Sequence, residues 1–322
     1  MAPMTGPLPL LRPMLAVSAQ PFDHPDFYFE VKWDGYRCLA YLGESGTSLV
    51  SRNQKDITAY FPDLAGLHRR VRGKPALLDG EITVLREGRP SFAALQSRAR
   101  LTGGDRVARA AQSAPALYMA FDILYHGGAP LLELPLTARM ATLEQAVNPD
   151  REILISEGVR ERGTAFFRAC VEKGLEGVVG KHLDGRYLPG TRSPLWKKIR
   201  ATREADLVIC GYRQGKGGRV LGSLVLGAWD GEEFIYQGMV GTGLTRAEEL
   251  TLLEKLATLE NAKAPWKETN PGGAGVKWVA PVMVCRVQYL TTTGRGLLRH
   301  PVYLGLREDK APQSCGPVLR QG

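Results

Sequence analysis

The chain has 322 residues, which is long enough for two domains of ordinary size and for a cleft between their lobes. Hydrophobic residues make up 44% of the sequence, and no run of about 18 apolar residues is present, so the composition argues against a membrane protein. The formal net charge of +9 at pH 7 favours a polyanionic partner, although solubility alone also explains a charge of this size.

Two features of the sequence bear on the cellular compartment. The apolar N-terminal stretch has no basic segment before it and contains several prolines, so we expect no secretory signal. The five cysteines are far apart and none is in CxxC spacing, which argues against a disulfide framework or a structural zinc site. We therefore expect a cytoplasmic protein with reduced cysteines.

The first 200 residues show the pattern of an α+β domain. Aromatic and β-branched residues around turn residues predict β-hairpins from residue 27 to 53, with a turn at 43–46. Further strands are predicted in the apolar runs 76–85 and 116–125. Helices are predicted over 91–100, over 138–147 with Thr137 as the cap, and over 163–173. These elements predict a domain built around antiparallel sheets.

The pattern changes after Trp196, where short strands alternate with glycine-rich turns. Strand-like runs cover 206–215, 223–231, 233–243 and 276–294, and a helix is predicted over 245–260. One helix between early and late strands suits a five-stranded β-barrel of the OB type, a fold that commonly binds nucleic acid. We place the boundary after residue 202, giving domains 1–202 and 203–322, with a hinge in the polar stretch 201–205.

The first pattern with chemical meaning is KWDGYR at residues 32–37, where a lysine follows a strand. A lysine attacks phosphorus only as a free amine, so such chemistry requires burial or neighbouring cations that lower the pKa of the amine. Taken alone, the pattern also fits a β-hairpin that carries a surface lysine.

Further short patterns follow in the order SRN at 51–53, DGE at 79–81, AFD at 120–122, EGVVGK at 176–181, WKKIR at 196–200 and REDK at 307–310. Each has an ordinary structural explanation. Phe121 would more often be a core residue than a platform for a base, Glu81 a solvated acid, and the basic run 197–200 an exposed edge. Their joint occurrence in this order favours a functional origin.

As a set, these patterns resemble the motifs of the covalent nucleotidyltransferase superfamily, and most closely those of bacterial ATP-dependent DNA ligases of the end-joining and ligase C type. The resemblance covers residues 11–310. It implies an adenylation (nucleotidyltransferase) domain over 1–202, with family motifs I to V, and an OB-fold domain over 203–322 that carries motif VI. The implied reaction joins breaks in DNA at the expense of ATP.

The resemblance also implies roles for individual residues. Lys32 is the implied AMP acceptor, Phe121 stacks on adenine, and Asp34 organises the 3′-hydroxyl or its metal. Glu81 and Glu176 are the implied acids for Mg²⁺ or Mn²⁺, with Glu81 also near the ribose. The remaining implied contacts to the nucleotide are Glu30, Arg37, Arg52, Lys181, Lys198 and Arg200. The implied contacts to the pyrophosphate are Arg307, Asp309 and Lys310.

The chain departs from the family pattern in motif V. The family usually has two lysines one residue apart, whereas this chain has Lys198 and Arg200, with Lys197 as an alternative first member. The distance to the following strand favours Lys198. Arg200 remains a suitable phosphate ligand because its guanidinium can form a two-pronged contact.

The substrate implied by the resemblance is DNA with nicks, gaps or ends, bound by a monomer that also cooperates with a repair polymerase or a DNA-end-binding protein. Because about thirty residues precede Lys32, we expect the two domains themselves to hold the DNA. Alternatives are an RNA-capping guanylyltransferase, an RNA ligase and a non-catalytic DNA-end-binding protein. Labelling with ATP or GTP separates the first alternative, and the presence of Lys32, Glu176 and Lys198 argues against the last.

Overall fold

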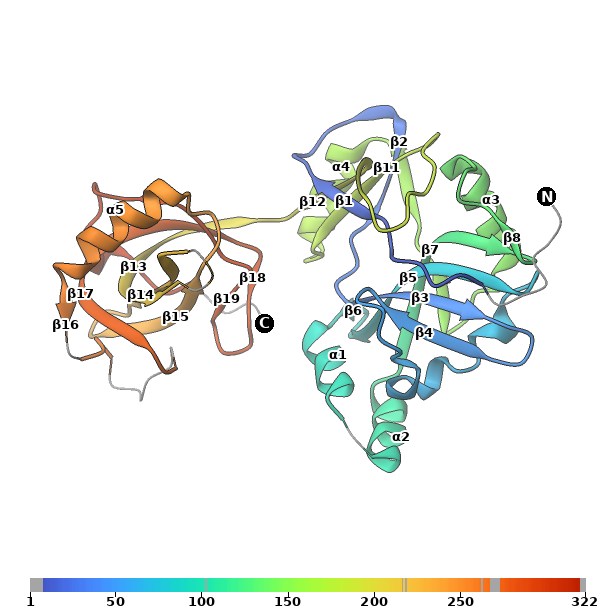
Figure 1. Ribbon diagram of the computed structural model, residues 1–322, viewed down its shortest axis with the longest axis horizontal. Helices are drawn as coiled ribbons and strands as arrows, with labels where there is room; N and C mark the ends of the chain where they lie inside the picture. The colour runs from blue at the N-terminus through green and yellow to red at the C-terminus, as the bar shows by residue number, and fades with distance from the viewer. Residues whose placement is uncertain are drawn as a thin grey trace. The chain divides into compact units, whose positions relative to one another are not determined.

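A computed structural model of the chain describes residues 8–101, 103–215, 217, 219–261, 263–266 and 273–318 (Figure 1). The chain forms two compact units, Met1–Ala201 and Thr202–Gly322. This division lies one residue before the boundary expected from the sequence. In the described part of the chain, no helix has the length and apolar character needed to cross a bilayer.

The first unit is built on two sheets in the residues described. One has the strand order β4-β3-β5-β7-β8, with β6 paired to β5 and β9 to β7. Its strands are β3 (Tyr36–Leu42), β4 (Thr47–Ser51), β5 (Ala76–Arg86), β6 (Arg89–Pro90), β7 (Ala116–His126), β8 (Ala129–Pro130) and β9 (Ile153–Ile155). The other has the order β1-β12-β11-β2-β10. Its strands are β1 (Leu15–Ser18), β2 (His24–Val31), β10 (Gly158–Glu161), β11 (Gly177–His182) and β12 (Arg192–Arg200).

Most strand pairs in these sheets are antiparallel, which confirms the predicted fold class; β1 with β12 and β7 with β9 are parallel. The hairpin of β3 and β4 is also confirmed, and its turn closes through a hydrogen bond from the Gly43 amide to the Gly46 carbonyl, 2.9 Å long.

The hairpin predicted over residues 27–42 is wrong, because β2 and β3 belong to different sheets. After β2 the Lys32 amide donates to the carbonyl of Gly177 in β11, 2.9 Å away. The chain then crosses to the other sheet, where it enters β3 beside β5. At the crossing a Cβ on Gly35 would overlap the carbonyl oxygen of Ile82, so glycine is required there. The short Asp-Gly connection between two apolar strands imitates a hairpin turn in the sequence.

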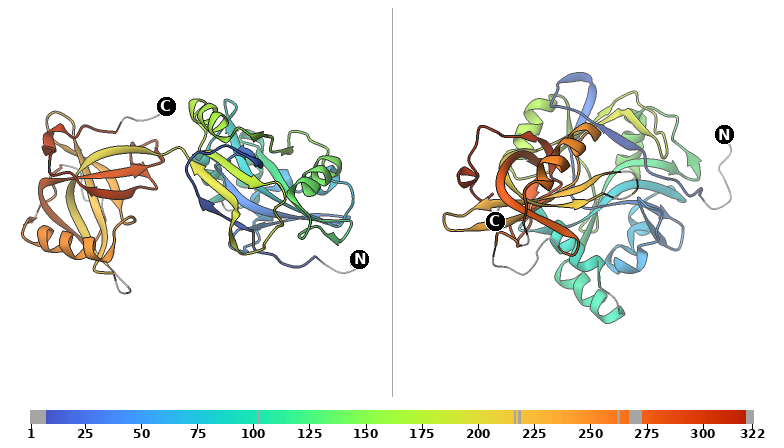
Figure 2. Two further views of the ribbon diagram at one scale, coloured as in Figure 1. Left: turned by 90° about the horizontal axis from the view of Figure 1, so that it is seen from above. Right: turned by 60° about the vertical axis from the view of Figure 1, so that its left-hand side comes forward.

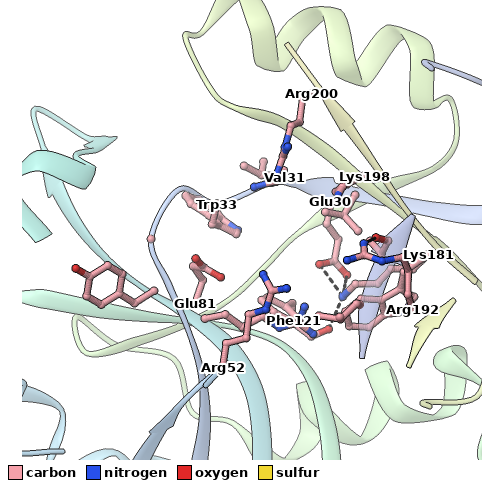
Figure 3. Close-up of a pocket in the computed structure, with 18 of the residues that line it drawn as sticks. Glu30, Val31, Trp33, Arg52, Glu81, Phe121, Lys181, Arg192, Lys198 and Arg200 are labelled. Carbon is pink, nitrogen blue, oxygen red and sulfur yellow. Dashed lines mark hydrogen bonds and ion pairs between the residues drawn. The ribbon is translucent and has the colours of Figure 1, made fainter. Parts of the chain in front are cut away.

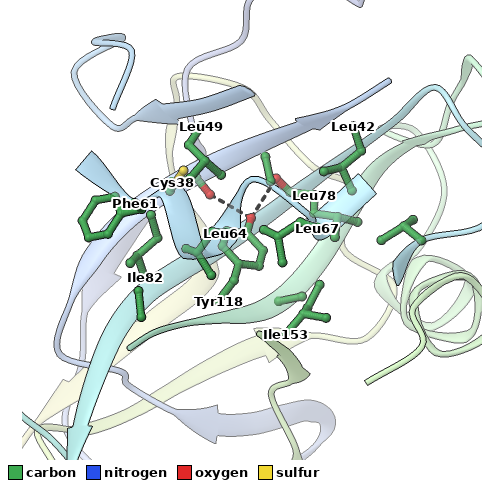
Figure 4. Packing of buried hydrophobic residues seen from close by; sticks show 14 of the residues in the cluster. Cys38, Leu42, Leu49, Phe61, Leu64, Leu67, Leu78, Ile82, Tyr118 and Ile153 are labelled. Atoms are coloured by element: carbon green, nitrogen blue, oxygen red, sulfur yellow. Dashed lines mark hydrogen bonds between the residues drawn. The ribbon is translucent and has the colours of Figure 1, made fainter. Parts of the chain in front are cut away.

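The main core of the first unit lies on one face of β3, β5 and β7 (Figure 4). Leu78 and Ile82 of β5 are fully buried there, and the Tyr118 hydroxyl donates to the carbonyls of Cys38 and Leu78 at 2.9 and 3.2 Å. Burial of each large apolar side chain contributes about 1.5–3 kcal/mol. Because side chains alternate along a strand, Leu78 and Ile82 face this core while Asp79 and Glu81 face the opposite side.

The helices of the first unit are α1 (Phe92–Ala99), α2 (Gly104–Ser113), α3 (Leu136–Ala146) and α4 (Gly163–Glu172), with short 3₁₀ helices η1 (Thr58–Tyr60), η2 (Pro62–Leu64) and η3 (Leu67–Arg70). Three of the four α-helices were predicted from the sequence. Thr137 is not the cap of α3, since the N-cap residue is Pro135 and makes no side-chain cap bond. Helix α2 was missed because Val107 is its one buried residue, which leaves no apolar periodicity to detect.

The second unit has the sheet order β15-β14-β13-β17-β16, with β20 paired to β17. Its elements are β13 (Arg203–Gln214), β14 (Leu221–Trp229), β15 (Phe234–Val240), α5 (Arg246–Ala257), β16 (Glu260–Asn261), β17 (Val276–Tyr289), β18 (Thr291–Thr292), β19 (Leu298–Arg299), β20 (Val302–Leu306) and η4 (Pro312–Ser314). Helix α5 begins with a capping box between Thr245 and Glu248, and its Leu252 and Leu256 belong to the core of this unit. The helix, drawn in orange, lies beside the strands of this unit (Figure 2). Three early strands, a helix and then the late strands, of which β17 and β20 are the longest, are consistent with the predicted OB-type barrel.

The connection between β12 and β13 is shorter than the polar stretch 201–205 suggested. Arg203, Glu204 and Ala205 are already part of β13 and pair with β17, so Ala201 and Thr202 are the residues between the two strands. The hinge stays a prediction.

Candidate active site

The first unit contains a cavity of about 500 Å³ between its two sheets (Figure 3). A cavity of this size lies within the range of about 300–1,000 Å³ that is usual for small-molecule sites. Most of the residues predicted for the site line it, namely Glu30, Lys32, Arg37, Arg52, Glu81, Phe121, Lys181, Lys198 and Arg200. Asp34 and Glu176 are not part of the lining, although Glu176 contacts Lys32.

Lys32 lies directly after the last residue of β2, and its Nζ donates to the carboxylate of Glu176. Glu176 also contacts Arg200, with Nε to Oε1 at 3.4 Å. The next residue, Gly177, has φ of +141°, and a Cβ there would overlap the carbonyl oxygen of Ile199. Glycine after Glu176 therefore lets β11 pass close to β12 and bring the acid to the lysine.

A group of cations covers another part of the cavity wall. Lys198 and Arg200 are two residues apart on β12 and so share a face. Burial and the neighbouring cations lower the pKa of Lys198, and these cations are, in order of effect, Arg200, Arg192, Lys32 and Arg52. Among the residues that the structure describes, Lys198 and Arg52 have no ion-pair partner. Such a group suits the phosphates of a nucleotide.

Lys197 faces away from the cavity and lies over the rings of Phe22 and Phe27, 4.7 Å from each centroid. The alternation of the strand therefore separates Lys197 from Lys198, in agreement with the preference for Lys198 in motif V.

Phe121 is half-buried at the cavity wall and contacts Trp196 edge to face, with centroids 6.1 Å apart. Nζ of Lys181 lies 4.6 Å from the centroid of the Phe121 ring. The same Nζ donates to both carboxylate oxygens of Glu30, at 2.8 and 2.9 Å, and to the carbonyl of Phe121, at 2.7 Å. These three bonds use all three donors of Lys181, so its predicted contact with the nucleotide has no spare donor in this arrangement.

Arg37 belongs to the same part of the cavity wall. It forms two hydrogen bonds with Asp79, at 3.0 and 2.6 Å, and its guanidinium lies 5.3 Å from the Phe121 centroid. The hydroxyl of Tyr187 donates to Asp79 at 2.6 Å. Asp79 is fully buried, and these three bonds satisfy a carboxylate that would otherwise be costly to bury.

Two acids of the cavity have altered proton affinities. Burial raises the pKa of Glu81 to about 8, although Lys32 and Arg37 oppose the change, and Glu176 adds to it. Burial also raises the pKa of Glu30 to about 7 against the effect of Lys181. A raised pKa in a cleft is typical of functional carboxylates.

Glu81 and Glu176 fit a divalent cation of the Mg²⁺ or Mn²⁺ type. The charge of Glu176 acts unfavourably on Glu81, and a cation with oxygen ligands would neutralise both carboxylates. No cluster of three or more Asp, Glu, His or Cys side chains that could hold a metal occurs in the described part of the chain. Mg²⁺ commonly uses one or two carboxylates and completes its coordination with water and substrate phosphates, so two acids are sufficient.

Several residues of the site had not been singled out from the sequence. Trp33 Nε1 donates to Ser156 Oγ at 2.9 Å, and Ser156 is also close to Glu30. Asp79 and Trp196 belong to recognised motifs, so their motifs were a usable signal. Ser156 and Tyr187 come from irregular segments and have no local sequence signal.

The predicted residues Arg307, Asp309 and Lys310 all lie in the second unit. Arg307 forms two hydrogen bonds with Asp309, at 2.8 and 2.6 Å, and contacts Asp206 at 3.0 Å. Asp206 also pairs with Lys310 at 2.8 Å and with Arg286 at 2.8 Å. Hydrogen bonds from Arg307 lower the pKa of Asp309 to about 2. Asp206 and Arg286, which join this cluster, were not predicted.

Comparison with known proteins identifies the family. Residues 13–200 match the ATP dependent DNA ligase domain, and residues 217–310 match the ATP dependent DNA ligase C terminal region. The chain is 35% identical over 309 residues to the multifunctional non-homologous end joining protein LigD of Mycobacterium bovis, which covers 94% of this chain and 39% of that protein. It thus spans well under half of this relative.

Two further relatives match over most of their length. DNA ligase C1 of Mycolicibacterium smegmatis is 32% identical over 328 residues, covering 95% of this chain and 92% of that protein. A solved structure of mycobacterial DNA ligase D complexed with ATP and MES has a TM-score of 0.54 and 32% identity, covering 96% of this chain and 98% of that chain. On these matches, and with the site geometry described above, the chain belongs to the ATP-dependent DNA ligase family.

Proposed function

We propose that this chain is an ATP-dependent DNA ligase that carries AMP on Lys32, transfers it to a DNA 5′-phosphate and seals the break with a 3′-hydroxyl. One observation carries the proposal. Lys32, which donates to Glu176, lies in a single cavity with the cations of β12, the acid Glu81 and the ring of Phe121. A nucleophile, phosphate ligands, cation ligands and a base platform therefore share one site of nucleotide size.

In the first step Nζ of Lys32 attacks the α-phosphorus of ATP. A nitrogen–phosphorus bond forms, the bond to the pyrophosphate oxygen breaks, and the amine proton leaves to solvent. Lys198 and Arg200 hold the phosphates, and Phe121 covers the base. Glu81 and Glu176 would hold a divalent cation, which supplies charge neutralisation at the α-phosphate when bound.

In the second step AMP passes from Lys32 to the 5′-phosphate of DNA, and in the third a 3′-hydroxyl displaces AMP. Asp34 is proposed to organise that hydroxyl. Arg307, Asp309 and Lys310 are proposed to orient the pyrophosphate in the first step, which requires motion near residues 201–205.

We propose that the enzyme repairs nicks, gaps or ends in DNA. The name of the LigD relative includes non-homologous end joining, which supports double-strand ends as a substrate and a repair polymerase or DNA-end-binding protein as a partner. The net charge of +9 supports binding to DNA that weakens strongly with salt.

The proposal is tested by intact-mass measurement after incubation with ATP and Mg²⁺ or Mn²⁺. The wild type should gain one AMP, and Lys32→Ala should gain none because the nucleophile is missing. Lys197→Ala is the matched control, since that lysine faces away from the cavity and should not affect the adduct. An AMP adduct on Lys32→Ala would show that the nucleophile is another residue, and labelling by GTP in place of ATP would favour a guanylyltransferase.

A further inference from the structure

A second buried ion pair lies next to the base platform and has no part in the chemistry proposed above. Arg139 of α3 is fully buried and forms two hydrogen bonds with Asp122, from Nε at 2.8 Å and from Nη2 at 3.0 Å. Its Nη1 donates to the carbonyls of Leu134 and Gly185, at 2.6 and 2.9 Å. The guanidinium thus joins β7, the start of α3 and the segment after β11.

Asp122 directly follows Phe121, and the pairing of β7 with β5 is irregular at this point. Asp79 lies opposite Asp122 and Gly80 lies opposite Ala120, so Phe121 is an extra residue without a partner on β5. A bulge of this kind re-aims a side chain and is frequent beside active sites. Here it accompanies the placement of the Phe121 ring at the cavity wall.

Two basic side chains hold the bulge, one at the backbone of Phe121 and one at the side chain of Asp122. The carbonyl of Phe121 accepts from Lys181 at 2.7 Å, and Asp122 is held by Arg139. A buried ion pair contributes little net stability, because the desolvation of both charges offsets their attraction. A pair that is fully buried, fully hydrogen-bonded and adjacent to a bulge is better explained by the geometry that it imposes.

We propose that Arg139 is a positioning residue that acts through Asp122 to hold the bulge at Phe121, and thereby sets the affinity of the first step for ATP. The inference rests on the proposed function in one respect, namely that the Phe121 ring covers the base. Arg139 itself does not line the cavity.

The first unit offers a matched control. Arg98 is 3% exposed and forms two hydrogen bonds with Asp63, at 2.7 and 2.8 Å, and one with the carbonyl of Ala114, at 3.0 Å. Neither Arg98 nor Asp63 lines the cavity. Arg98→Lys therefore removes a comparable two-bond contact from a pair that is also largely buried, with side chains 3% and 15% exposed, but away from the base platform.

The experiment measures the rate of AMP adduct formation against ATP concentration. Because base stacking is worth about 1–3 kcal/mol, its partial loss in Arg139→Lys should raise KM for ATP about tenfold, with a change of less than about threefold in the rate at saturation. Arg98→Lys should leave KM within about twofold, whatever its melting temperature. A general loss of folded protein would lower the rate at saturation in both variants, without a rise in KM for ATP that is confined to Arg139→Lys.

A double-mutant cycle tests the route of the effect. If Arg139 acts through Phe121, Arg139→Lys should add nothing to KM in a Phe121→Ala background. Should Arg139→Lys fail to fold, the neutral pair Asp122→Asn with Arg139→Gln takes its place and should give the same rise in KM.

An unchanged KM in these variants, an equal rise in Arg98→Lys, or additive effects in the cycle would overturn the inference. Failure of the proposed function is a separate result, because wild type and Arg98→Lys would then form no AMP adduct at all.

Discussion

Glu81 should make the stability of the first unit depend on pH in an unusual direction. Its pKa is about 8 in the folded chain, compared with an ordinary value of 4.5. Between these two pH values the folded protein retains a proton that the unfolded chain has released, so the free energy of unfolding falls as pH rises. Glu81→Gln removes the titration and mimics the neutral carboxyl, and the variant should therefore lack this loss.

The size of the effect follows from the pKa and from the location of the side chain. The full interval between 4.5 and about 8 corresponds to about 5 kcal/mol, at about 1.4 kcal/mol per unit. Because Glu81 lines an open cavity that water enters, we expect about 2 kcal/mol after screening. At pH 8.5 Glu81→Gln should be more stable than wild type by this amount, and at pH 5 the two should be nearly equal.

The assay is urea denaturation at both pH values, followed by the fluorescence of Trp33 and Trp196 in a chain whose other tryptophans are replaced by phenylalanine. These two tryptophans are in the first unit, so the signal reports on the part that contains Glu81. Millimolar Mg²⁺ at pH 8.5 should stabilise the wild type more than Glu81→Gln, because the variant lacks one carboxylate ligand. The same pH dependence in both proteins would refute the reasoning.

Three further changes separate the parts of the site. Phe121→Ala should weaken the use of ATP by about 1–3 kcal/mol without altering the metal requirement, as seen from adduct formation against ATP and Mg²⁺ concentration; an unchanged KM would make the ring a core residue. Lys198→Gln should slow adduct formation about a hundredfold through loss of a phosphate ligand, whereas Lys197→Gln should not. Arg307→Ala should impair adduct formation and spare the sealing of nicked DNA that already carries a 5′-AMP; equal loss in both assays would point to a role in folding or DNA binding.

The strands that carry the motifs were predictable because they show strong local signals. The runs that form β5 and β7 are apolar, long and bounded by turn residues, and their alternation also places Asp79 and Glu81 on one face. The partner of a strand is a different matter. The sequence of β2 is compatible with pairing to β3 or to β11, and packing of the whole unit decides between them.

Long-range anchors explain most of what the sequence could not predict about the site. Tyr187 reaches Asp79 from 108 residues further along the chain, and no periodic pattern marks either residue as a partner of the other. Arg139 occupies a helix whose sequence would suit an exposed arginine equally well. The bulge at Phe121 is also invisible locally, because the extra residue is defined by the register with β5.

Cations on and behind the cavity wall differ in their partners, and this difference refines the roles implied by the family resemblance. Arg37, Lys181 and Arg139 are each bound to a buried carboxylate, so a phosphate could recruit them only by leaving that carboxylate unpaired. Leaving a buried charge unpaired costs about 3–5 kcal/mol. Lys198 and Arg52 have no such partner in the described part of the chain and can bind a phosphate without that cost. We therefore propose that the paired group shapes the wall around Phe121, and that the unpaired group, together with Arg200, supplies the charge for the triphosphate.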